Sequence, residues 1–451
     1  MTFFKTAKPI VFIGAAGEMC RVAIERFAAA SDAPLILADI NTSVLETLTA
    51  KLPAGRASTK KLDLFDRAAL IDTIQGAALV VLGAGPYMRT SAPVLSACLD
   101  AKVPYLDFDD DVQSTQDALG LHERAKKEGV PCYIGCGASP GMTNVMVMDA
   151  VRELDTVETI DVCWLVGDER GSTGKAVLEH LMHIASGPCL TWADGKPTMN
   201  ESWVETTYAP MLAGEGETLL HETAHPEPVT LPRLFPNATR IRCAGALGPA
   251  PLNGIARGLG QAVRRNAISM EEAVNFLLKL TSEDPSAGWG EAFGELSATF
   301  RGGDITVKEL IQLAGQLSHS LSPWRYAIYG LIETIWSGEC TTGEVLSFLV
   351  SSARGKRVEN KGGLLVRAVG LRNGHPATVT KRTAKCGETT FLSRTMGTVT
   401  GTSTAAFVLL ALEDGTTRSG VYAPEDWAEP SRFYSALERL GTPKDELVEK
   451  I

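Results

Sequence analysis

The sequence predicts an α/β protein, with an N-terminal doubly wound parallel sheet of the Rossmann type and a central α+β domain with a helical insertion. Short apolar runs alternate with helical patterns over residues 9–150, and a glycine turn joins the first run to the first helix. After residue 150 this alternation gives way to mixed patterns. Alternating strands and helices at this spacing form a parallel sheet covered by helices on both faces.

The first 150 residues contain six short apolar runs, and longer helical patterns separate them. We expect strands at 9–13, 35–38, 58–64, 78–82, 104–108 and 131–134. We expect helices at 18–30, 42–52, 67–75, 91–101 and 114–128. Short apolar runs bounded by turn residues are typical of strands buried on both faces.

The central and last parts of the chain combine both kinds of pattern. We expect a strand at 159–166, a helix at 175–185, helices over 255–350, a hairpin over 363–381, a strand at 407–412 and a helix at 430–440. The hairpin turns at Asn373-Gly374, a pair that favours tight two-residue turns. Three capping boxes mark helix starts, and these are Ser269/Glu272, Thr306/Glu309 and Thr341/Glu344.

The composition bounds the function. Hydrophobic residues make up 45% of the 451 residues, which is enough for a sizeable core. The formal net charge of −10 disfavours a nucleic-acid partner, because an acidic chain repels phosphate. No apolar run reaches the ~18 residues that span a bilayer, so we expect no membrane contact. The nine cysteines contain no CxxC pair, which indicates reduced thiols and a cytoplasmic protein.

The turn after the first strand is suited to a dinucleotide. A pyrophosphate needs backbone N–H groups, no intruding side chain and the positive end of a helix. The strict G-x-G-x-x-G pattern is broken, and an ordinary βα turn is the alternative. We expect the cofactor to contact Gly14, Ala15, Ala16, Gly17, Glu18 and Met19.

Residues at the ends of later strands extend this site. Asp39 ends the second strand, where a carboxylate binds the ribose hydroxyls and repels a 2′-phosphate, so NAD is favoured over NADP. Asp63 follows the third strand and is expected near the adenine. Gly83, Ala84, Gly85 and Pro86 end the fourth strand on the nicotinamide side, and Tyr87 after them is a catalytic candidate.

Taken together, several motifs resemble the saccharopine dehydrogenase family. They are Ile13-Gly14-Ala15-Ala16-Gly17, Gly85-Pro86-Tyr87, Val103-Pro104-Tyr105-Leu106-Asp107, residues 135–144 (GCGASPGMTN) and residues 420–425 (GVYAPE). The resemblance implies a Rossmann domain completed by the C-terminal segment, and a central domain that covers the active site and mediates dimerisation. It also implies oxidation or formation of C–N bonds at amino-acid carbons. Ala16 and Cys20 depart from the glycine pattern and leave the cofactor preference open.

On this basis we divide the chain into two domains. Residues 1–150, completed by 395–451, form the dinucleotide-binding domain, and residues 151–394 form the central substrate and dimerisation domain. The last strand and helix cannot bury their apolar sides alone. We therefore expect residues from about 395 onward to pack against residues 1–150.

Candidate substrate-binding residues come from several segments. Asp107 ends the fifth strand and could orient an amino group or take its proton. Lys175 is a candidate proton acceptor if burial lowers its pKa. A carboxylate-bearing substrate is expected to meet Arg89, Ser172, Thr173 and Arg233. Asp109 points the same way as Asp107 if the strand persists, whereas Asp110 and Asp111 are expected to cap the next helix. Cys136 is expected to be a packed side chain.

Two histidine patterns admit more than one interpretation. His221, Glu222 and His225 match HExxH, but neighbouring Pro and Gly residues leave little room for a helix, so we expect no zinc there. His180 and His183 share a helix face and are expected to be structural.

The leading hypothesis is an NAD-dependent dehydrogenase, NADP being the second choice, that acts on an amino- or imino-bearing carbon of an amino acid or opine-like substrate. The alternatives are a dinucleotide-binding protein without turnover and an alcohol or C=C oxidoreductase on the same scaffold.

Overall fold

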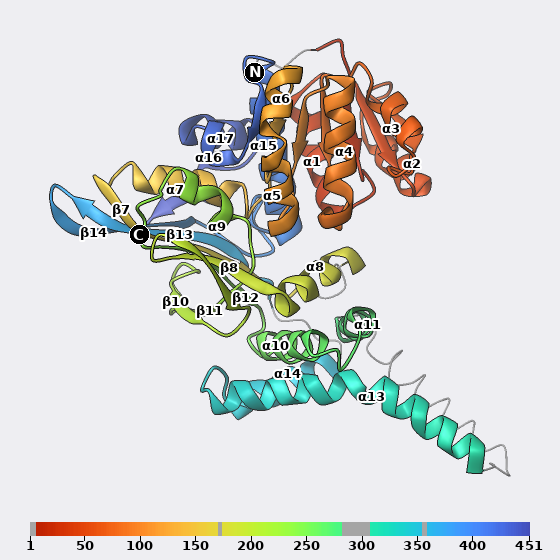
Figure 1. Ribbon diagram of the computed structural model, residues 1–451, viewed down its shortest axis with the longest axis vertical. Coiled ribbons are helices and arrows are strands. Elements are labelled where there is room, and N and C mark those ends of the chain that lie inside the picture. Colours follow the sequence, from red (N-terminus) through yellow and green to blue (C-terminus); the bar gives the residue numbers. More distant parts are fainter. Residues whose placement is uncertain (1–5, 170–173, 282–306, 354–358) are drawn as a thin grey trace.

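The protein is built on two β-sheets with helices packed on both. This computed structural model describes residues 6–169, 174–281, 307–353 and 359–451, with the backbone alone at 307–321 and 353. The first sheet and its helices lie at the top of Figure 1, the second sheet in the middle and a group of helices at the bottom. The α/β fold class predicted from the sequence is confirmed.

In the described part of the chain, the first sheet has seven parallel strands in the order β15-β6-β5-β4-β1-β2-β3. They are β1 (Ile10–Ile13), β2 (Leu35–Asp39), β3 (Ala57–Lys61), β4 (Leu79–Leu82), β5 (Tyr105–Asp107), β6 (Pro131–Tyr133) and β15 (Gly420–Tyr422). The strand order reverses between β1 and β4. In sheets of this kind ligands bind beyond the carboxyl ends of the strands at that point.

Helices cover both faces of this sheet. One face carries α1 (Glu18–Ala30), α2 (Thr42–Lys51) and α15 (Met396–Asp414). The other carries α3 (Arg67–Ile74), α4 (Tyr87–Ala101), α5 (Val112–Gly120) and α6 (His122–Glu128). Phe12, Phe27 and Phe407 are fully buried in the first of these layers, so the C-terminal helix shares a core with the N-terminal strands.

The C-terminal segment returns to the first sheet, but not through the expected strand. Residues 407–412 belong to α15, so the prediction of a strand there is wrong. α15 is buried on nearly all sides against α1 and its neighbours, and a helix apolar all round shows no period from which it could be recognised. The strand that joins the sheet is β15, which pairs with β6. α16 (Pro424–Trp427) and α17 (Pro430–Arg439) follow, the second as expected.

α15 is also the one described helix that is long and apolar enough to cross a membrane, with a mean hydropathy of 1.2 over its most apolar window. Of that window, 83% is buried inside the protein. The helix therefore has the surroundings of a core helix.

The second sheet is mixed and has the order β10-β11-β12-β7-β13-β14-β16, with β8 beside β12 and β9 beside β8. Its strands are β7 (Thr156–Val166), β8 (Pro188–Ala193), β9 (Lys196–Glu201), β10 (Thr206–Ala209), β11 (Thr218–Glu222), β12 (Arg240–Leu247), β13 (Gly363–Arg372), β14 (His375–Thr383) and β16 (Val448–Lys450). β7 and β12 run parallel, and the other pairs are antiparallel. α7 (Met142–Val151) packs on this sheet and on α16 and α17, so it joins the two halves.

The remaining helices are α8 (Lys175–Ser186), α9 (Glu227–Thr230), α10 (Pro251–Arg264), α11 (Met270–Leu280), α13 (Val307–Trp336) and α14 (Thr342–Ala353), with short 3-10 turns at Leu231–Arg233 and Lys444–Glu446. Among them, α9 faces the first domain, because its Glu227 accepts a hydrogen bond from Ser139. α10 and α13 approach so closely that a Cβ on Gly330 would lie 1.8 Å from the Gly254 carbonyl oxygen. The capping boxes at Ser269 and Thr341 form as expected, whereas that at Thr306 lies outside the described side chains.

Candidate active site

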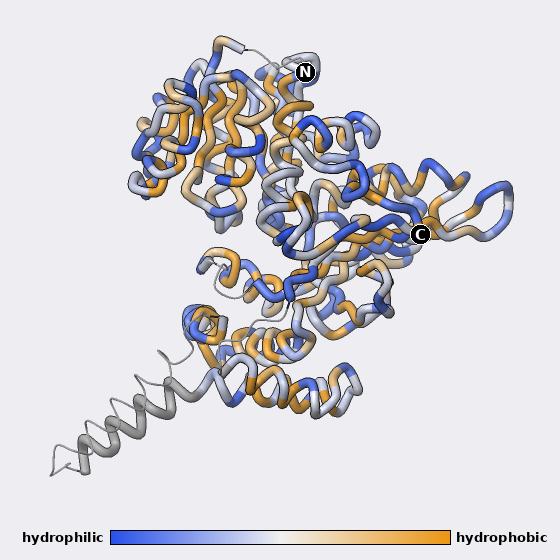
Figure 2. The backbone as a smooth tube through the Cα atoms, turned by 180° about the vertical axis from the view of Figure 1, so that it is seen from behind, coloured by the Kyte–Doolittle hydropathy of each residue, from blue (hydrophilic) through white to orange (hydrophobic). Residues whose placement is uncertain are grey.

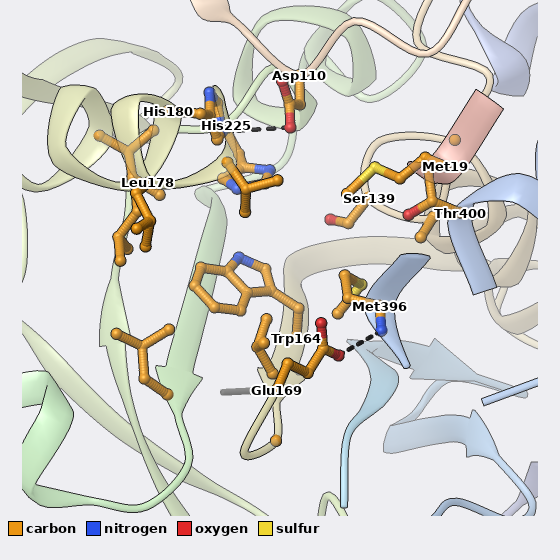
Figure 3. Close-up of a pocket in the computed structure, with 18 of the residues that line it drawn as sticks. Met19, Asp110, Ser139, Trp164, Glu169, Leu178, His180, His225, Met396 and Thr400 are labelled. Atoms are coloured by element: carbon orange, nitrogen blue, oxygen red, sulfur yellow. Dashed lines mark hydrogen bonds and ion pairs between the residues drawn. The ribbon is translucent and has the colours of Figure 1, made fainter. Parts of the chain in front are cut away.

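A cavity lies between the carboxyl edge of the first sheet and the second domain (Figure 3). It encloses about 1240 Å³, counted to its open mouth. The first domain lines it with Met19, Tyr87, Phe108, Asp110, Ser139 and Thr400. The second domain contributes Trp164, Glu169, Leu178, His180, His225 and Leu277, among others. The cavity thus extends from Met19, in the first turn of α1, to the helices of the second domain.

The glycine turn fits a dinucleotide. Gly14 has a φ of +80°, and a Cβ there would lie 2.5 Å from the backbone nitrogen of Ala84. The backbone nitrogens of Gly14 and Ala15 bond to the Ala38 carbonyl, which closes the turn on β2. α1 begins after Gly17, whose position offers no side chain to cap the helix. The positive end of α1 is therefore presented to a ligand by backbone alone.

Asp39 supports this turn from the end of β2. Its Oδ2 accepts a hydrogen bond from the Ala16 nitrogen at 3.0 Å, and its Oδ1 accepts one from the Asn41 nitrogen at 2.9 Å. The sheet register places Lys61 of β3 beside Asp39. In the sequence no basic residue directly follows Asp39, where it could bind a 2′-phosphate. The fold supplies one from the neighbouring strand, where sequence order hides it.

The remaining cofactor candidates lie around the same edge. Asp63 is exposed in the loop after β3, and its carboxylate accepts a hydrogen bond from the Phe65 nitrogen. Gly83 is in close contact with α1, because a Cβ there would lie 2.8 Å from the Cys20 sulfur. Burial raises the pKa of the Glu18 carboxyl at the start of α1.

Tyr87 lines the cavity at the start of α4, after Gly85 and Pro86. Its ring meets that of Phe108 edge-on, with the centroids 5.9 Å apart. Burial, followed by the charge of Asp110, raises the pKa of the Tyr87 phenol well above its ordinary value. The phenol therefore keeps its proton and can donate a hydrogen bond into the cavity.

The acidic residues 107–111 at and after the end of β5 have different roles, because some hold the backbone and one faces the cavity. Asp107 Oδ1 accepts hydrogen bonds from the Gly135 and Asp109 nitrogens at 2.7 and 3.1 Å, and Asp107 does not line the cavity. Burial raises its pKa to about 6. Asp109 accepts a hydrogen bond from the Ser91 hydroxyl at 2.6 Å. The expectation that Asp107 meets the substrate needs correction, because its carboxylate holds a loop and Asp110 is the member that faces the cavity.

Two histidines of α8 pair with this cluster. His180 Nε2 lies 3.2 Å from Asp110 Oδ2, the ion pair dashed in Figure 3, and His183 Nε2 lies 3.1 Å from Asp111 Oδ2. The hydrogen bond to Asp111 raises the pKa of His183, and the bond from His183 helps to lower that of Asp111. These pairs join the two domains across the cavity. The sequence signal was present, since adjacent acids face histidines one helical turn apart, but nothing local indicated that they meet.

A second histidine and carboxylate lie deeper in the wall. His225 Nδ1 is 3.7 Å from Glu227 Oε2, and the His225 ring lies 5.7 Å from that of Trp164. Burial, and then His180, lower the pKa of His225 to about 3, whereas burial raises that of Glu227 to about 7. At neutral pH the imidazole is therefore uncharged. Among the described residues, His225, Glu227 and Cys243 also form a group whose potential metal-ligand atoms lie within 4.8 Å of one another.

Residues 135–144, one of the motifs that resemble the saccharopine dehydrogenase family, connect the second domain with the C-terminal segment through hydrogen bonds. Ser139 donates to Glu227 Oε1 at 2.5 Å, and Asn144 donates to Glu425 Oε2 at 2.8 Å. Cys136 is fully buried, as expected of a packed side chain, and burial raises its pKa well above the ordinary value.

Glu169 closes the lower rim in Figure 3 and accepts a hydrogen bond from the Met396 nitrogen at 2.6 Å. Burial raises its pKa to about 7, and the nearby Glu18 carboxylate raises it further against the effect of this bond. Glu169 and Trp164 were not singled out in the sequence, because each stands in an ordinary strand or loop pattern.

Several predicted residues lie elsewhere. Lys175 has a side chain 53% exposed and pairs with Glu179 at 3.8 Å, so the burial on which its proposed role depends is not found. Arg233 bonds to Asp426 at 2.7 Å and ties α9 to α16, away from the cavity lining. Arg89 is exposed over the Phe65 ring and does not line the cavity. Ser172 and Thr173 lie outside the described residues.

The HExxH match does not form a metal site of the zincin kind. His221 and Glu222 end β11, a strand, so the two histidines are not one helical turn apart. His221 Nε2 lies 3.1 Å from Glu339 Oε2, which also accepts from Arg257 at 3.1 Å. The absence of zinc at His221, Glu222 and His225 stays a prediction.

Fold and cavity together define a class, a nicotinamide-dinucleotide-binding protein whose Rossmann-type domain is completed by the C-terminal segment and faced by a second domain. Residues 10–132 match the family described as the saccharopine dehydrogenase NADP binding domain. In this domain, which makes up less than half of the chain, the protein is similar to the saccharopine dehydrogenase family.

Two similar proteins agree with this placement. An apo saccharopine dehydrogenase (L-Glu forming) from Saccharomyces cerevisiae has a TM-score of 0.60 at 13% identity, with 99% of this chain and 100% of that chain covered. It therefore shares the fold. The carboxyaminopropylagmatine dehydrogenase of Synechocystis sp. is 27% identical over 176 residues, which cover 37% of this chain and 43% of that protein. The match thus spans less than half of that relative.

Proposed function

We propose that the protein is a nicotinamide-dependent dehydrogenase acting on an amino- or imino-bearing carbon held in the cavity. The observation that carries this proposal is the placement of the Asp110–His180 pair, 3.2 Å apart, in a cavity that also reaches Met19 in the first turn of α1, directly after the glycine turn. Both relatives described above are named dehydrogenases. A bound nicotinamide dinucleotide would supply the acceptor or donor of hydride.

The side chains of this protein supply the remaining requirements. Gly14, Ala15 and Gly17, with the first turn of α1, would hold the pyrophosphate, and Asp39 the adenosine ribose. The His180 imidazole would accept a proton from the substrate nitrogen or from water, and Asp110, 3.2 Å from its Nε2, would stabilise the resulting imidazolium. Tyr87 donates a hydrogen bond to the reacting group. Trp164 and the leucines around it exclude water from the reacting carbon.

The test is to incubate the protein with oxidised NAD or NADP and panels of amines, amino acids and alcohols, and to record reduced nicotinamide by absorbance. We expect turnover with compounds that carry nitrogen on the reacting carbon. His180→Gln is expected to lower kcat about 100-fold or more while leaving dinucleotide affinity unchanged. His183→Gln, which removes the neighbouring pair outside the cavity lining, is the matched control. Turnover of alcohols alone would favour the alcohol oxidoreductase, and binding without any turnover the sensor or structural protein.

We also propose that the protein works as a homodimer in the cytoplasm. α13 and α14 leave an apolar surface exposed, with Trp336 exposed by 86%. The other exposed members are Ile328, Tyr329, Ile332, Leu346 and Val350. All nine cysteines are free thiols, which suits a reducing compartment. Light scattering should give twice the chain mass for the wild type and the single mass for Trp336→Glu. A wild-type monomer at micromolar concentration would contradict the dimer.

A further inference from the structure

The cavity has two ends of opposite character. Beside the first domain it is polar, with Asp110, Ser139, His180 and His225 around it (Figure 3). Away from Met19 and Thr400, the side chains of the second domain are apolar. They are Leu178, Leu181, Ile184, Leu252, Ala256 and Leu277, with Thr281 as a polar neighbour whose hydroxyl bonds to the Leu277 carbonyl. Trp164 lies between the two ends. A ligand that fills the cavity must therefore be polar at its reacting end and apolar beyond it.

The wall offers no permanent positive charge among the described residues. The described lining contains the carboxylates of Asp110, Asp168 and Glu169, and no lysine or arginine. The two arginines expected to hold a substrate carboxylate lie elsewhere, Arg89 over Phe65 and Arg233 against Asp426. A substrate carboxylate would lose its hydration here and meet acidic neighbours, whereas an ammonium group would meet Asp110 and the face of Trp164.

Resting on the proposed function, we propose that the substrate is an amine whose nitrogen-bearing carbon carries an apolar chain or ring and no carboxylate. In the oxidative direction its C–H bond breaks and the electron pair leaves as hydride to the oxidised nicotinamide dinucleotide. The nitrogen gives one proton to His180 as the C=N bond forms. Water then hydrolyses the imine to a carbonyl compound and ammonia. The apolar end binds the chain, and each added methylene raises affinity about fourfold until that end is filled.

Matched pairs of compounds test this selectivity, because they differ only in the carboxylate. Pentylamine is compared with norleucine, and benzylamine with phenylglycine. Two quantities are measured, kcat/KM from reduced nicotinamide and Kd by calorimetry without dinucleotide. We expect the amine of each pair to be favoured at least tenfold in both, and affinity to rise along the series from propylamine to hexylamine.

A preference for the amino acid in either pair overturns the substrate class and leaves the dehydrogenase proposal standing. If no compound is turned over, the dehydrogenase proposal fails, and the calorimetric ranking alone decides the class of ligand. A flat series from propylamine to hexylamine would overturn the assignment of the apolar end.

A charge placed on the wall provides the converse test. Val177 lines the cavity on α8 and is 41% exposed, so Val177→Arg can fold without a buried charge. It should improve kcat/KM or Kd for norleucine at least tenfold relative to pentylamine. Val204→Arg, at a valine that is 46% exposed outside the lining, should leave the ratio unchanged. An unchanged ratio in Val177→Arg would contradict the proposal, because the lack of a cation would then not be what excludes the carboxylate.

Discussion

The two domains contribute to the cavity in different ways. The first domain lines the cavity with Met19 and Gly137, and beside the cavity it presents the turn of Gly14 and Gly17, where a side chain would crowd the backbone. The second domain contributes long side chains, such as Trp164, Leu178 and His180. In the function proposed above, the dinucleotide would be recognised by the shape of the backbone at that turn. The substrate differs from one relative to another, and we expect its selection to depend on side chains that change without altering the backbone.

The largest effect is expected from removing the C-terminal residues that complete the first domain. A chain ending at residue 390 loses α15, β15 and α17, and exposes the apolar side of α1. We expect it to be insoluble, or to lack fixed tertiary structure and dinucleotide binding, as judged by near-UV circular dichroism and calorimetry. A chain ending at residue 447 loses only β16 at the edge of the second sheet and should bind normally. Equal dinucleotide affinity in the shorter chain would show that the first domain is complete without its C-terminal part.

A single substitution tests whether dinucleotide binding by the first domain depends on the backbone shape of the glycine turn. Gly14→Val places a β-branched residue at a φ of +80° and 2.5 Å from the Ala84 nitrogen. We expect a loss of about 3 kcal/mol in the free energy of unfolding and at least 100-fold weaker dinucleotide binding. Gly55→Val has a similar φ of +76° but open space around it, so it isolates the strain from the clash. If urea titrations give the two variants equal losses, the close contact at Gly14 is unimportant.

The difference between the two domains also explains which parts of the fold and of the site could be predicted from the sequence. Most neighbouring strands of the first sheet are consecutive in the chain, and local periods and turns located β1 to β6 and Gly14. The second sheet pairs β7 with β13, which lies about two hundred residues later, and no local pattern encodes that pairing. His180 and Asp110 meet only after both domains have folded. Arg233 shows the converse, since a cation suited to a ligand is taken by Asp426, which the sequence places far away.

The third prediction, of intermediate size, concerns how protonation of Glu169 at the rim of the cavity changes the free energy of unfolding. The pKa of Glu169 is raised to about 7 from an ordinary 4.5, so folding favours its protonated form. Its contribution to stability is therefore fully present below about pH 4.5 and is lost as the pH rises through about 7. Relative to Glu169→Gln, the wild type should lose up to about 3 kcal/mol between about pH 5 and pH 8 in urea unfolding. Glu388→Gln, at an exposed site, should follow the wild type. A constant difference between wild type and Glu169→Gln would show that Glu169 does not gain a proton on folding.

The smallest expected effect concerns Asp39, the side chain of the first domain that we expect to select between NAD and NADP. Asp39 lies beside the glycine turn and would meet the 2′ position of the ribose, whereas Lys61 lies beside it on β3. We expect NAD to bind more tightly than NADP, because the carboxylate repels the 2′-phosphate. Asp39→Ala should narrow the gap, and Lys61→Ala should widen it, each by about tenfold or ~1.4 kcal/mol. Calorimetry with NAD and NADP measures the difference in affinity for each variant at one salt concentration, since exposed charges are screened by salt.

A tenfold preference of the wild type for NADP would reverse the assignment. Its loss in Lys61→Ala would then identify the lysine as the residue that the sequence order concealed. A preference for NADP that survives in Lys61→Ala would instead place the phosphate away from β3.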